Sequence, residues 1–307
     1  MPAPAPTRAL SAGFQTAITE QDVRRILSSL ADDSMQGRLT GTPGANRAAR
    51  FIDREMRSIG LMPAGDSGYY QKVPLAARRI GYNLIGVVRG SDPVLRDQVV
   101  VIAAHYDHLG IGAPVNGDSI YNGADDDASG VTAVLEIARS LIAGPSPKRT
   151  VVLVTTSGEE EGILGMQWYV AHPEFPLSKM VAEMEIEMIG RPDSLAGGPG
   201  MAWLTGYDRS TMGEMLKAAG VPIVADPYPD QQFFERSDNI VFAQMGIPAH
   251  TLSSYNLHSD YHQPSDDIGK IDFAHVTAVI RAGAMAARIL ADGPAPMWKA
   301  GGKPAAH

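Results

Sequence analysis

Apolar residues follow two different patterns along the chain. From residue 82 onward, short apolar runs alternate with stretches in which apolar residues recur every three or four positions. The short runs predict strands, and the longer spacing predicts helices. The expected strands span residues 82–88, 98–104, 150–156, 180–187, 201–205 and 248–252, and the expected helices span residues 129–142, 162–171, 210–219, 237–245 and 272–291. This alternation is typical of an α/β fold, a three-layer α/β/α sandwich around a mostly parallel mixed sheet.

Two more helices are expected before the first of these strands. Thr19 and Thr42 are residues of the type that caps a helix N-terminus, and Pro43 suits the first helical position. Gly60 marks the end of the second helix. Helical spacing follows the two caps, at Val23, Ile26, Leu27 and Leu30 and at Ala48, Ile52, Met56 and Ile59.

Residues 19–292 are expected to form a single domain. No linker interrupts this stretch, and a chain of 307 residues is at the upper end of what one core organises. Residues 1–18 and 293–307 are rich in Pro and Ala and are predicted to be flexible arms. The glycine-containing segment 110–117 is expected to be a loop.

Composition excludes several kinds of partner and chemistry. The net charge is −8 and no stretch gathers Lys or Arg, so nucleic acid is not an expected partner. No apolar run approaches the roughly 20 residues that a membrane helix needs, and no membrane span is expected. The chain has no cysteine, which excludes disulfides, thiolate nucleophiles and thiolate metal sites. Any metal must therefore be held by His and carboxylate side chains.

Imidazoles and carboxylates gather where the predicted strands end. Ligands in an open α/β sheet bind beyond the carboxyl ends of the strands. One such residue alone has an ordinary explanation, such as an acid at a helix start. So many carboxylates at one edge would repel one another unless cations neutralise them. His and carboxylate ligands without sulfur suit zinc, and their number suggests two ions that share one carboxylate. The groups follow in chain order: His105 with Asp107, Asp125 to Asp127, Glu159 to Glu161, Glu187, and His258 to His262.

Five motifs in this order resemble a known family. The segments HYDHLG (105–110), GADDDASGV (123–131), SGEEEGILG (157–165), EMIG (187–190) and DYHQPSD (260–266) look like those of the co-catalytic zinc aminopeptidases of metallopeptidase family twenty-eight. The resemblance covers most of residues 30–290, including QGRLTGTPG (36–44) and RSDNIVFAQMGIPA (236–249). It implies a zinc-peptidase-like fold and a zinc-dependent exopeptidase, in the first place an aminopeptidase acting on peptides with a free N-terminus.

The resemblance also implies metal ligands. It places two Zn²⁺ ions per chain, bridged by Asp126, with His105 and Glu187 on one ion and Glu160 and His262 on the other. Most of the family has Asp where this chain has Glu187, whose side chain is one methylene longer. Of the eight histidines, only His105 and His262 are assigned as ligands. Histidines near the same edge, which are His108, His250 and His258, are left to substrate contact or to support of the ligands.

Further residues take supporting or catalytic roles by the same resemblance. Glu159 matches the general base, which takes a proton from water and returns it to the leaving amine. Tyr261 is placed to help hold the oxyanion. Asp107 is expected to accept a hydrogen bond from the second ring nitrogen of His105. Asp127 is expected to support the ligands from behind. The peptide bond that joins it to Asp126 is similar to one that is cis in the family.

Several functions besides the aminopeptidase stay open. A dipeptidase or carboxypeptidase needs a cation for the substrate carboxylate, and Arg191, Arg209 and Arg236 are candidates. A single-zinc glutaminyl cyclase and a non-catalytic binding module of the same fold also stay open. Phe233 and Phe234 suit either a pocket or the core. Because family members are often exported, a periplasmic or secreted location is expected. The oligomeric state is not addressed by the sequence.

Overall fold

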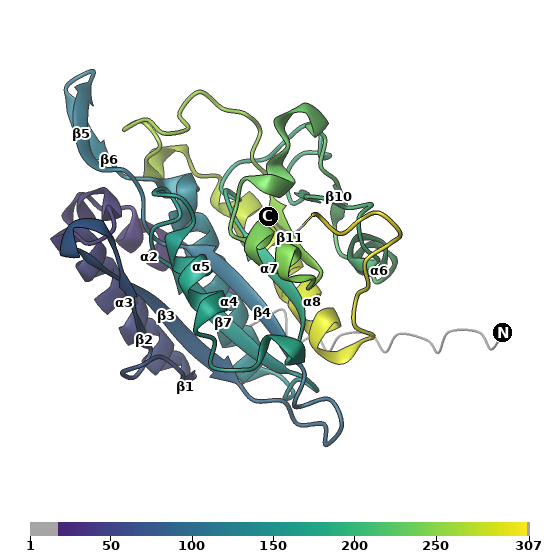
Figure 1. The fold of residues 1–307 in the computed structure, drawn as a ribbon. Coiled ribbons are helices and arrows are strands. Elements are labelled where there is room, and N and C mark those ends of the chain that lie inside the picture. Colours follow the sequence, from purple (N-terminus) through teal and green to yellow (C-terminus); the bar gives the residue numbers. More distant parts are fainter. Residues whose placement is uncertain (1–17, 306–307) are drawn as a thin grey trace.

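The computed structural model describes residues 18–305, and a nine-stranded mixed sheet forms their centre (Figure 1). The strand order is β1-β3-β7-β4-β8-β11-β9-β10, and β2 pairs with β3. The four middle strands β7, β4, β8 and β11 are parallel to one another, whereas antiparallel pairs join β3 to β7 and β11 to β9. The strands are β1 (Met62–Pro63), β2 (Tyr70–Pro74), β3 (Ile80–Val88), β4 (Val99–His105), β7 (Thr150–Thr156), β8 (Met180–Ile186), β9 (Ala202–Leu204), β10 (Ile223–Ala225) and β11 (Ala249–Ser253).

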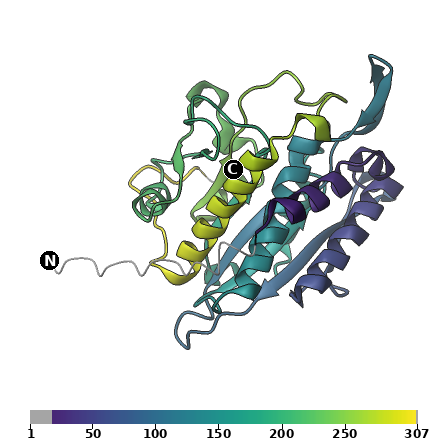
Figure 2. The ribbon, with the colours of Figure 1, turned by 180° about the vertical axis from the view of Figure 1, so that it is seen from behind.

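Helices cover both faces of the sheet, which confirms the predicted three layers (Figures 1 and 2). On one face, α3, α4 and α8 contact the strands, and α2 packs on α4 and α8. On the other face α5 and α7 pack against the strands and each other, and α6 lies beside β10. The helices are α2 (Glu20–Leu30), α3 (Pro43–Ile59), α4 (Gly130–Ala143), α5 (Leu164–Ala171), α6 (Met212–Ala218), α7 (Asn239–Met245) and α8 (Phe273–Asp292).

The predicted caps begin the first two helices. The Thr19 hydroxyl accepts a hydrogen bond from the Asp22 amide, and the Thr42 hydroxyl accepts one from the Ala45 amide. Gly60 ends α3 in the left-handed conformation, which carries little penalty without a Cβ. Strands β4 and β7 are buried along their whole length, because helices cover both of their faces. This rigid centre positions the loops that follow its strands.

A hairpin replaces the loop that the sequence predicted at residues 110–117. Strands β5 (Gly110–Val115) and β6 (Asp118–Tyr121) pair antiparallel and project from the body of the molecule (Figure 1). Asn116 and Gly117 form its turn, both with positive φ. Asn-Gly is the typical sequence of a two-residue hairpin turn, so the chain carried a signal for this element.

Residues 293–305, most of the C-terminal segment that was expected to be flexible, are packed against the domain. The indole N–H of Trp298 donates a hydrogen bond to the Gly246 carbonyl at 2.9 Å, and its ring lies against His250 and Phe234. A single aromatic residue in a Pro- and Ala-rich stretch shows no periodicity, although it buries much apolar surface. The predicted N-terminal arm lies outside the described residues, except Ile18, which is buried.

Helix α8 is the one helix of residues 18–305 whose length and apolar composition would suffice to cross a bilayer. In its most apolar 18-residue window, 72% is buried inside the protein, where α8 packs on α4 and contacts β4. This burial is what a core helix of the sandwich shows.

Candidate metal centre

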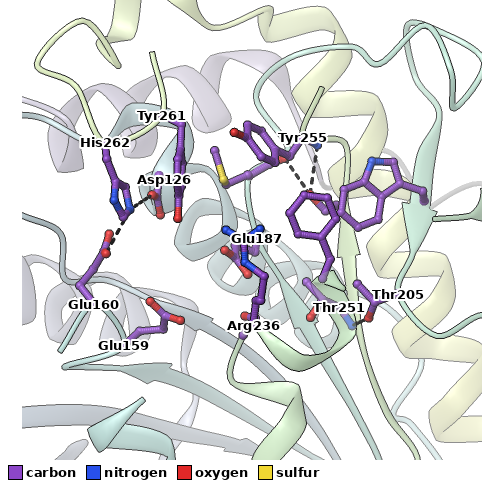
Figure 3. Close-up of a pocket in the computed structure, with 15 residues that line it drawn as sticks. Asp126, Glu159, Glu160, Glu187, Thr205, Arg236, Thr251, Tyr255, Tyr261 and His262 are labelled. Atoms are coloured by element: carbon purple, nitrogen blue, oxygen red, sulfur yellow. Dashed lines mark hydrogen bonds and ion pairs between the residues drawn. The ribbon is translucent and has the colours of Figure 1, made fainter. Parts of the chain in front are cut away.

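One pocket is lined by residues at or beyond the carboxyl ends of the parallel strands β7, β8 and β11 (Figure 3). The buried His105, at the end of β4, contacts Asp126 of this pocket. His105 is the last residue of β4, and Glu187 directly follows β8. Glu159 and Glu160 follow β7, Asp126 lies in the loop before α4, and His262 lies in the loop after β11. The structure thus brings all five residues predicted as metal ligands to one place.

Asp126 joins two groups of possible metal ligands. In the first group, Asp126, His105 and Glu187 each offer an atom within 4.8 Å of the others. The Asp126 Oδ1 atom lies 3.3 Å from His105 Nε2. Both Asp126 and His105 are buried, so water competes little for their charge.

The second group contains the predicted Glu160 and His262 and one residue that was not assigned. Nε2 of His262 lies 3.2 Å from Asp126 Oδ2 and 3.1 Å from Glu160 Oε2. The unassigned residue is His108, whose Nδ1 lies 2.8 Å from Glu160 Oε1. Its signal in the sequence was a second histidine three residues after His105, in the same loop.

The donors fit a divalent metal such as zinc. The Nε2 atom of His105 is buried without a hydrogen-bond partner among residues 18–305, although a carboxylate oxygen lies close to it. Imidazole nitrogen and carboxylate oxygen are ligands that zinc accepts. Burial raises the pKa of Glu187 to about 7, with a further rise from Asp126. A carboxylate in such a place is stabilised by a cation next to it.

Histidine and carboxylate charges depend on one another in this site. Burial would raise the pKa of Asp126, but His108, His105 and His262 together hold that pKa well below its usual range. Burial lowers the pKa of His262, but the hydrogen bonds to Asp126 and Glu160 raise it more. The net result is a pKa of about 10. The carboxylates therefore attract either protons on the imidazoles or a metal ion between them.

Glu159 lies beside the ligands without belonging to either group. Its side chain points into the pocket next to Glu160 (Figure 3). Burial raises the pKa of Glu159 well above its usual range, although His105 opposes this. A carboxylate with a raised pKa is a better proton acceptor. Glu161, in contrast, forms a bidentate ion pair with Arg79 and does not line the pocket.

The expected hydrogen bond between the His105 ring and the Asp107 carboxylate is wrong in detail. His105 Nδ1 lies 3.2 Å from the main-chain carbonyl oxygen of Asp107, whereas the nearest carboxylate oxygen is 3.9 Å away. The Asp107 carboxylate instead accepts the main-chain N–H of Glu159 at 3.2 Å. Its side chain therefore ties the loop after β7 to the loop after β4.

Asp127, expected to support the ligands, and Tyr261, expected to hold the oxyanion, both lie beside the ligand residues. The Asp127 carboxylate accepts the main-chain N–H groups of Gly130 and Met188 at 2.9 and 3.0 Å, and the peptide bond from Asp126 to Asp127 is cis. Asp127 thus connects the loop before α4 to the segment after β8. The Tyr261 ring stacks on His262, with centroids 3.9 Å apart, and its hydroxyl group points into the pocket (Figure 3).

A buried cation that the sequence did not single out holds the ligand loops. Arg38 is fully buried and donates hydrogen bonds to the main-chain carbonyls of Tyr106, Leu30, Asn122 and Gly123 at 2.5–2.9 Å. Tyr106 follows one ligand, and Gly123 precedes another by three residues. The signal was an arginine inside the QGRLTGTPG segment, but nothing in that segment indicates a contact with residues almost 90 positions later.

The loop after β11 holds the Asp126 loop from the other side. The Asp266 carboxylate accepts the main-chain N–H groups of Asp125 and Asp126 at 3.1 Å. Arg191 pairs with Asp266 at 3.2 Å and with Asp260 at 2.6 Å. Arg191 is therefore engaged in these ion pairs. Arg209 lies over the Phe234 ring and 3.9 Å from Glu235, outside the pocket.

An aromatic wall faces the metal ligands across the pocket (Figure 3). Phe233 stacks on Trp203 with ring centroids 5.3 Å apart and meets Tyr255 edge to face. Phe234 instead packs with His250 in the core. The guanidinium group of Arg236 lines the pocket beside this wall, 5.0 Å from the Phe233 ring. Three aromatic rings, one cation and the hydroxyl groups of Thr205 and Thr251 thus line this side of the pocket.

The fold and the site define the class of metal-dependent hydrolases with an α/β sandwich. Comparison with known proteins specifies the family: a sequence profile described as Peptidase family M28 matches residues 83–287. The match covers more than half of the chain, and the chain belongs to this family.

Individual relatives and structures agree with this assignment. The chain is 30% identical over 237 residues to a probable leucine aminopeptidase 2 from Aspergillus oryzae, covering 72% of this chain and 45% of that protein. The fold matches an aminopeptidase from Aneurinibacillus sp. strain AM-1 at a TM-score of 0.68 with 16% identity, covering 92% of this chain and 96% of that one. It also matches a Porphyromonas gingivalis glutaminyl cyclase at 0.67 with 17% identity, covering 88% and 98%.

The chain spans 27–39% of the length of several curated fungal relatives named probable zinc metalloprotease, among them one from Pyricularia oryzae. The similarity therefore concerns only the part of these longer proteins that aligns with the chain.

Proposed function

We propose that the protein is a zinc-dependent aminopeptidase with two zinc ions per chain. The observation that carries the proposal is that Asp126 joins two groups of His and carboxylate ligands and that Asp126, Glu160, Glu187 and His262 line one pocket together with Glu159. The relatives named zinc metalloprotease and leucine aminopeptidase support the metal and the reaction. The substrate is a peptide with a free N-terminus.

His105, Asp126 and Glu187 would hold one ion, and Asp126, Glu160 and His262 the other. Zinc, when bound, acts as a Lewis acid and lowers the pKa of water toward about 7. Glu159 accepts the proton of the attacking water and delivers it to the amine of the leaving group. The Tyr261 hydroxyl donates a hydrogen bond to the oxygen of the scissile carbonyl as negative charge develops there. The aromatic wall of Trp203, Phe233 and Tyr255 receives an apolar side chain.

Hydrolysis of matched peptides tests the proposal. The zinc-loaded protein is expected to cleave peptides with a free N-terminal amine and to leave their N-acetylated counterparts intact. Glu159→Gln is expected to lower kcat by about 10²–10⁴-fold, the usual contribution of a general base. Glu161→Gln is the matched control, because this neighbour pairs with Arg79 outside the pocket. Equal cleavage of acetylated and free peptides would refute the aminopeptidase but retain a peptidase.

Arg236 favours a second candidate function, a dipeptidase or carboxypeptidase. Of the three arginines considered from the sequence, Arg236 lines the pocket, and no carboxylate of residues 18–305 forms an ion pair with it. A free guanidinium group suits the carboxylate of a short peptide. Cleavage of dipeptides, but not of their C-terminal amides, together with a raised KM in Arg236→Gln for the free acids only, would favour this function.

The cyclase and the binding module are tested with the same protein. A glutaminyl cyclase would convert peptides with N-terminal Gln to the cyclic product without cleaving peptides of different sequence. A binding module would bind peptides without turnover, although Glu159 and all five expected ligand positions carry competent side chains. The periplasmic or secreted location stays a prediction, which fractionation of the native cells would test.

A further inference from the structure

We propose that His108 is a ligand of the second ion and that this site binds its ion first. The proposal rests on the proposed function only in that the centre binds zinc. His108 lies outside the five ligands that the motifs imply, but the structure groups its ring with Asp126, Glu160 and His262, each offering an atom within 4.8 Å of the others. The second site then has four protein ligands, whereas the first has three.

The two imidazoles approach the same pair of carboxylates from different directions. His108 Nδ1 lies 2.8 Å from Glu160 Oε1 and 3.7 Å from Asp126 Oδ2. His262 Nε2 lies 3.1 Å from the second Glu160 oxygen, Oε2, and 3.2 Å from the same Asp126 oxygen. The two rings are 5.6 Å apart and inclined by 69°. Each of the four residues therefore offers a donor atom within 4.8 Å of the other three.

The distances from the two imidazoles to the two carboxylates are of the size that a tetrahedral site requires. Zinc binds His nitrogen and carboxylate oxygen at about 2.0–2.2 Å, so two ligands at the tetrahedral angle lie about 3.3–3.6 Å apart. The four measured separations, from 2.8 to 3.7 Å, bracket this range. An ion there needs only small adjustments of side chains that are already in place.

The backbone holds the His108 ring in this position. The ring packs on Gly123, where a Cβ atom would lie 2.6 Å from the Cγ and Cδ2 atoms of His108. Gly123 has a φ of 58°, and its carbonyl oxygen accepts a hydrogen bond from the Arg38 guanidinium group at 2.9 Å. The loop that presents Asp126 is thus shaped to leave room for the imidazole.

The site with four protein ligands and the site with three are expected to differ in zinc affinity. Zinc is usually four-coordinate in structural sites, which are closed by protein, and catalytic sites keep one position open. The site with His108 is closed by its four side chains, whereas the site of His105, Asp126 and Glu187 leaves a position for water or substrate. The closed site is therefore expected to bind zinc at least about tenfold more tightly. Loss of a residue that only supports a ligand already lowers metal affinity by about 10–100-fold, and a direct ligand should contribute no less.

X-ray absorption of the metal-free protein loaded with one equivalent of zinc tests the proposal. Two imidazoles per zinc are expected, from His108 and His262. One imidazole per zinc would overturn the proposal, because it means that the ion binds beside His105 or that His108 only donates a hydrogen bond to Glu160. The measurement uses the unaltered chain, so it does not depend on whether a variant folds.

Variants separate ligation from positioning. In His108→Asn the amide nitrogen can replace Nδ1 as a donor to Glu160 but supplies no imidazole. We expect one imidazole per zinc and an affinity for the first equivalent of zinc that is lower by at least about tenfold, measured by competition with a chelator. Unchanged affinity would assign His108 a positioning role and overturn the proposal. His172→Ala, which removes an exposed histidine stacked on Trp168, is the matched control and should change neither readout.

The outcome is independent of peptide turnover. Two imidazoles in a protein that cleaves no peptide would retain the His108 site and refute the aminopeptidase. One imidazole in an active aminopeptidase would do the reverse. A protein that binds no zinc in elemental analysis would refute both.

Discussion

Replacing Arg38 by lysine tests how far the metal centre depends on one buried cation. The guanidinium group donates to four main-chain carbonyls at 2.5–2.9 Å and to the Asp126 carbonyl at 3.4 Å. A lysine keeps the charge, but its three N–H donors radiate from one atom, whereas the guanidinium group spreads five over a plane. We expect lysine to reach at most two of the four close carbonyls.

The expected loss of stability follows from the two carbonyls that remain without a hydrogen-bond donor. A buried carbonyl without a donor costs about 1–3 kcal/mol, so two of them lower the free energy of unfolding by about 2–6 kcal/mol. Urea unfolding of the metal-free protein, followed by circular dichroism, measures this loss as a lower midpoint at constant slope. Zinc affinity should fall as well, because the same carbonyls fix the loops of His105 and Asp126.

A surface arginine provides the control. Arg57 is largely exposed and pairs with Asp53 on the same helix, so Arg57→Lys should leave the urea midpoint nearly unchanged. If Arg38→Lys loses no more than this control and binds zinc as before, the reasoning that Arg38 positions the ligand loops is refuted.

Three further changes have defined outcomes. Burial raises the pKa of Glu174 from 4.5 to about 7, so the native protein loses stability as pH rises from about 4.5 to 7. In urea titrations, Glu174→Gln should therefore be more stable than wild type by up to about 3 kcal/mol at pH 8, and no more stable at pH 4.5. Trp298→Ala should lower the free energy of unfolding by about 2 kcal/mol, less than the 3–5 kcal/mol of a fully buried aromatic residue, whereas an unchanged free energy of unfolding would contradict the packing of the C-terminal segment. Removal of metal by a chelator should lower the melting temperature, since an ion at about 100 times its Kd adds about 2.7 kcal/mol, and an unchanged melting curve would contradict metal binding to the folded state.

The sequence predicted those parts of the fold that depend on residues close together in the chain. Apolar runs located the four central strands within a residue or two, since a strand buried on both faces must be apolar throughout. Threonine caps and a terminal glycine located α2 and α3 because these signals act within one turn. The hairpin at Gly110–Tyr121 was missed although Asn116 and Gly117 signalled its turn, because exposed strands show little apolar alternation.

The same distinction separates the parts of the site that the sequence predicted from those that it did not. The sequence predicted which segments carry the donors, because parallel strands deliver their carboxyl ends to one edge. It left His108 unassigned, because the direction of a side chain within a four-residue loop depends on the backbone that Gly123 and Arg38 impose. Arg38 and Asp266 act across large sequence separations through main-chain groups, and main-chain contacts leave no mark on the residue type of the partner.

The charges of the pocket explain why these supports are needed. Arg38 and Arg191 are committed to main-chain carbonyls and to the carboxylates of Asp260 and Asp266, so they fix the loops without neutralising the groups that face the pocket. The carboxylates facing the pocket are balanced by imidazoles, whose protons are attracted strongly enough to raise the pKa of His262 to about 10. A ligand imidazole must give up that proton before it binds a metal. Protons and divalent ions are therefore two ways to satisfy the same carboxylates, and the surrounding network keeps the donors in place for either. The four carboxylates concerned are those of Asp126, Glu159, Glu160 and Glu187.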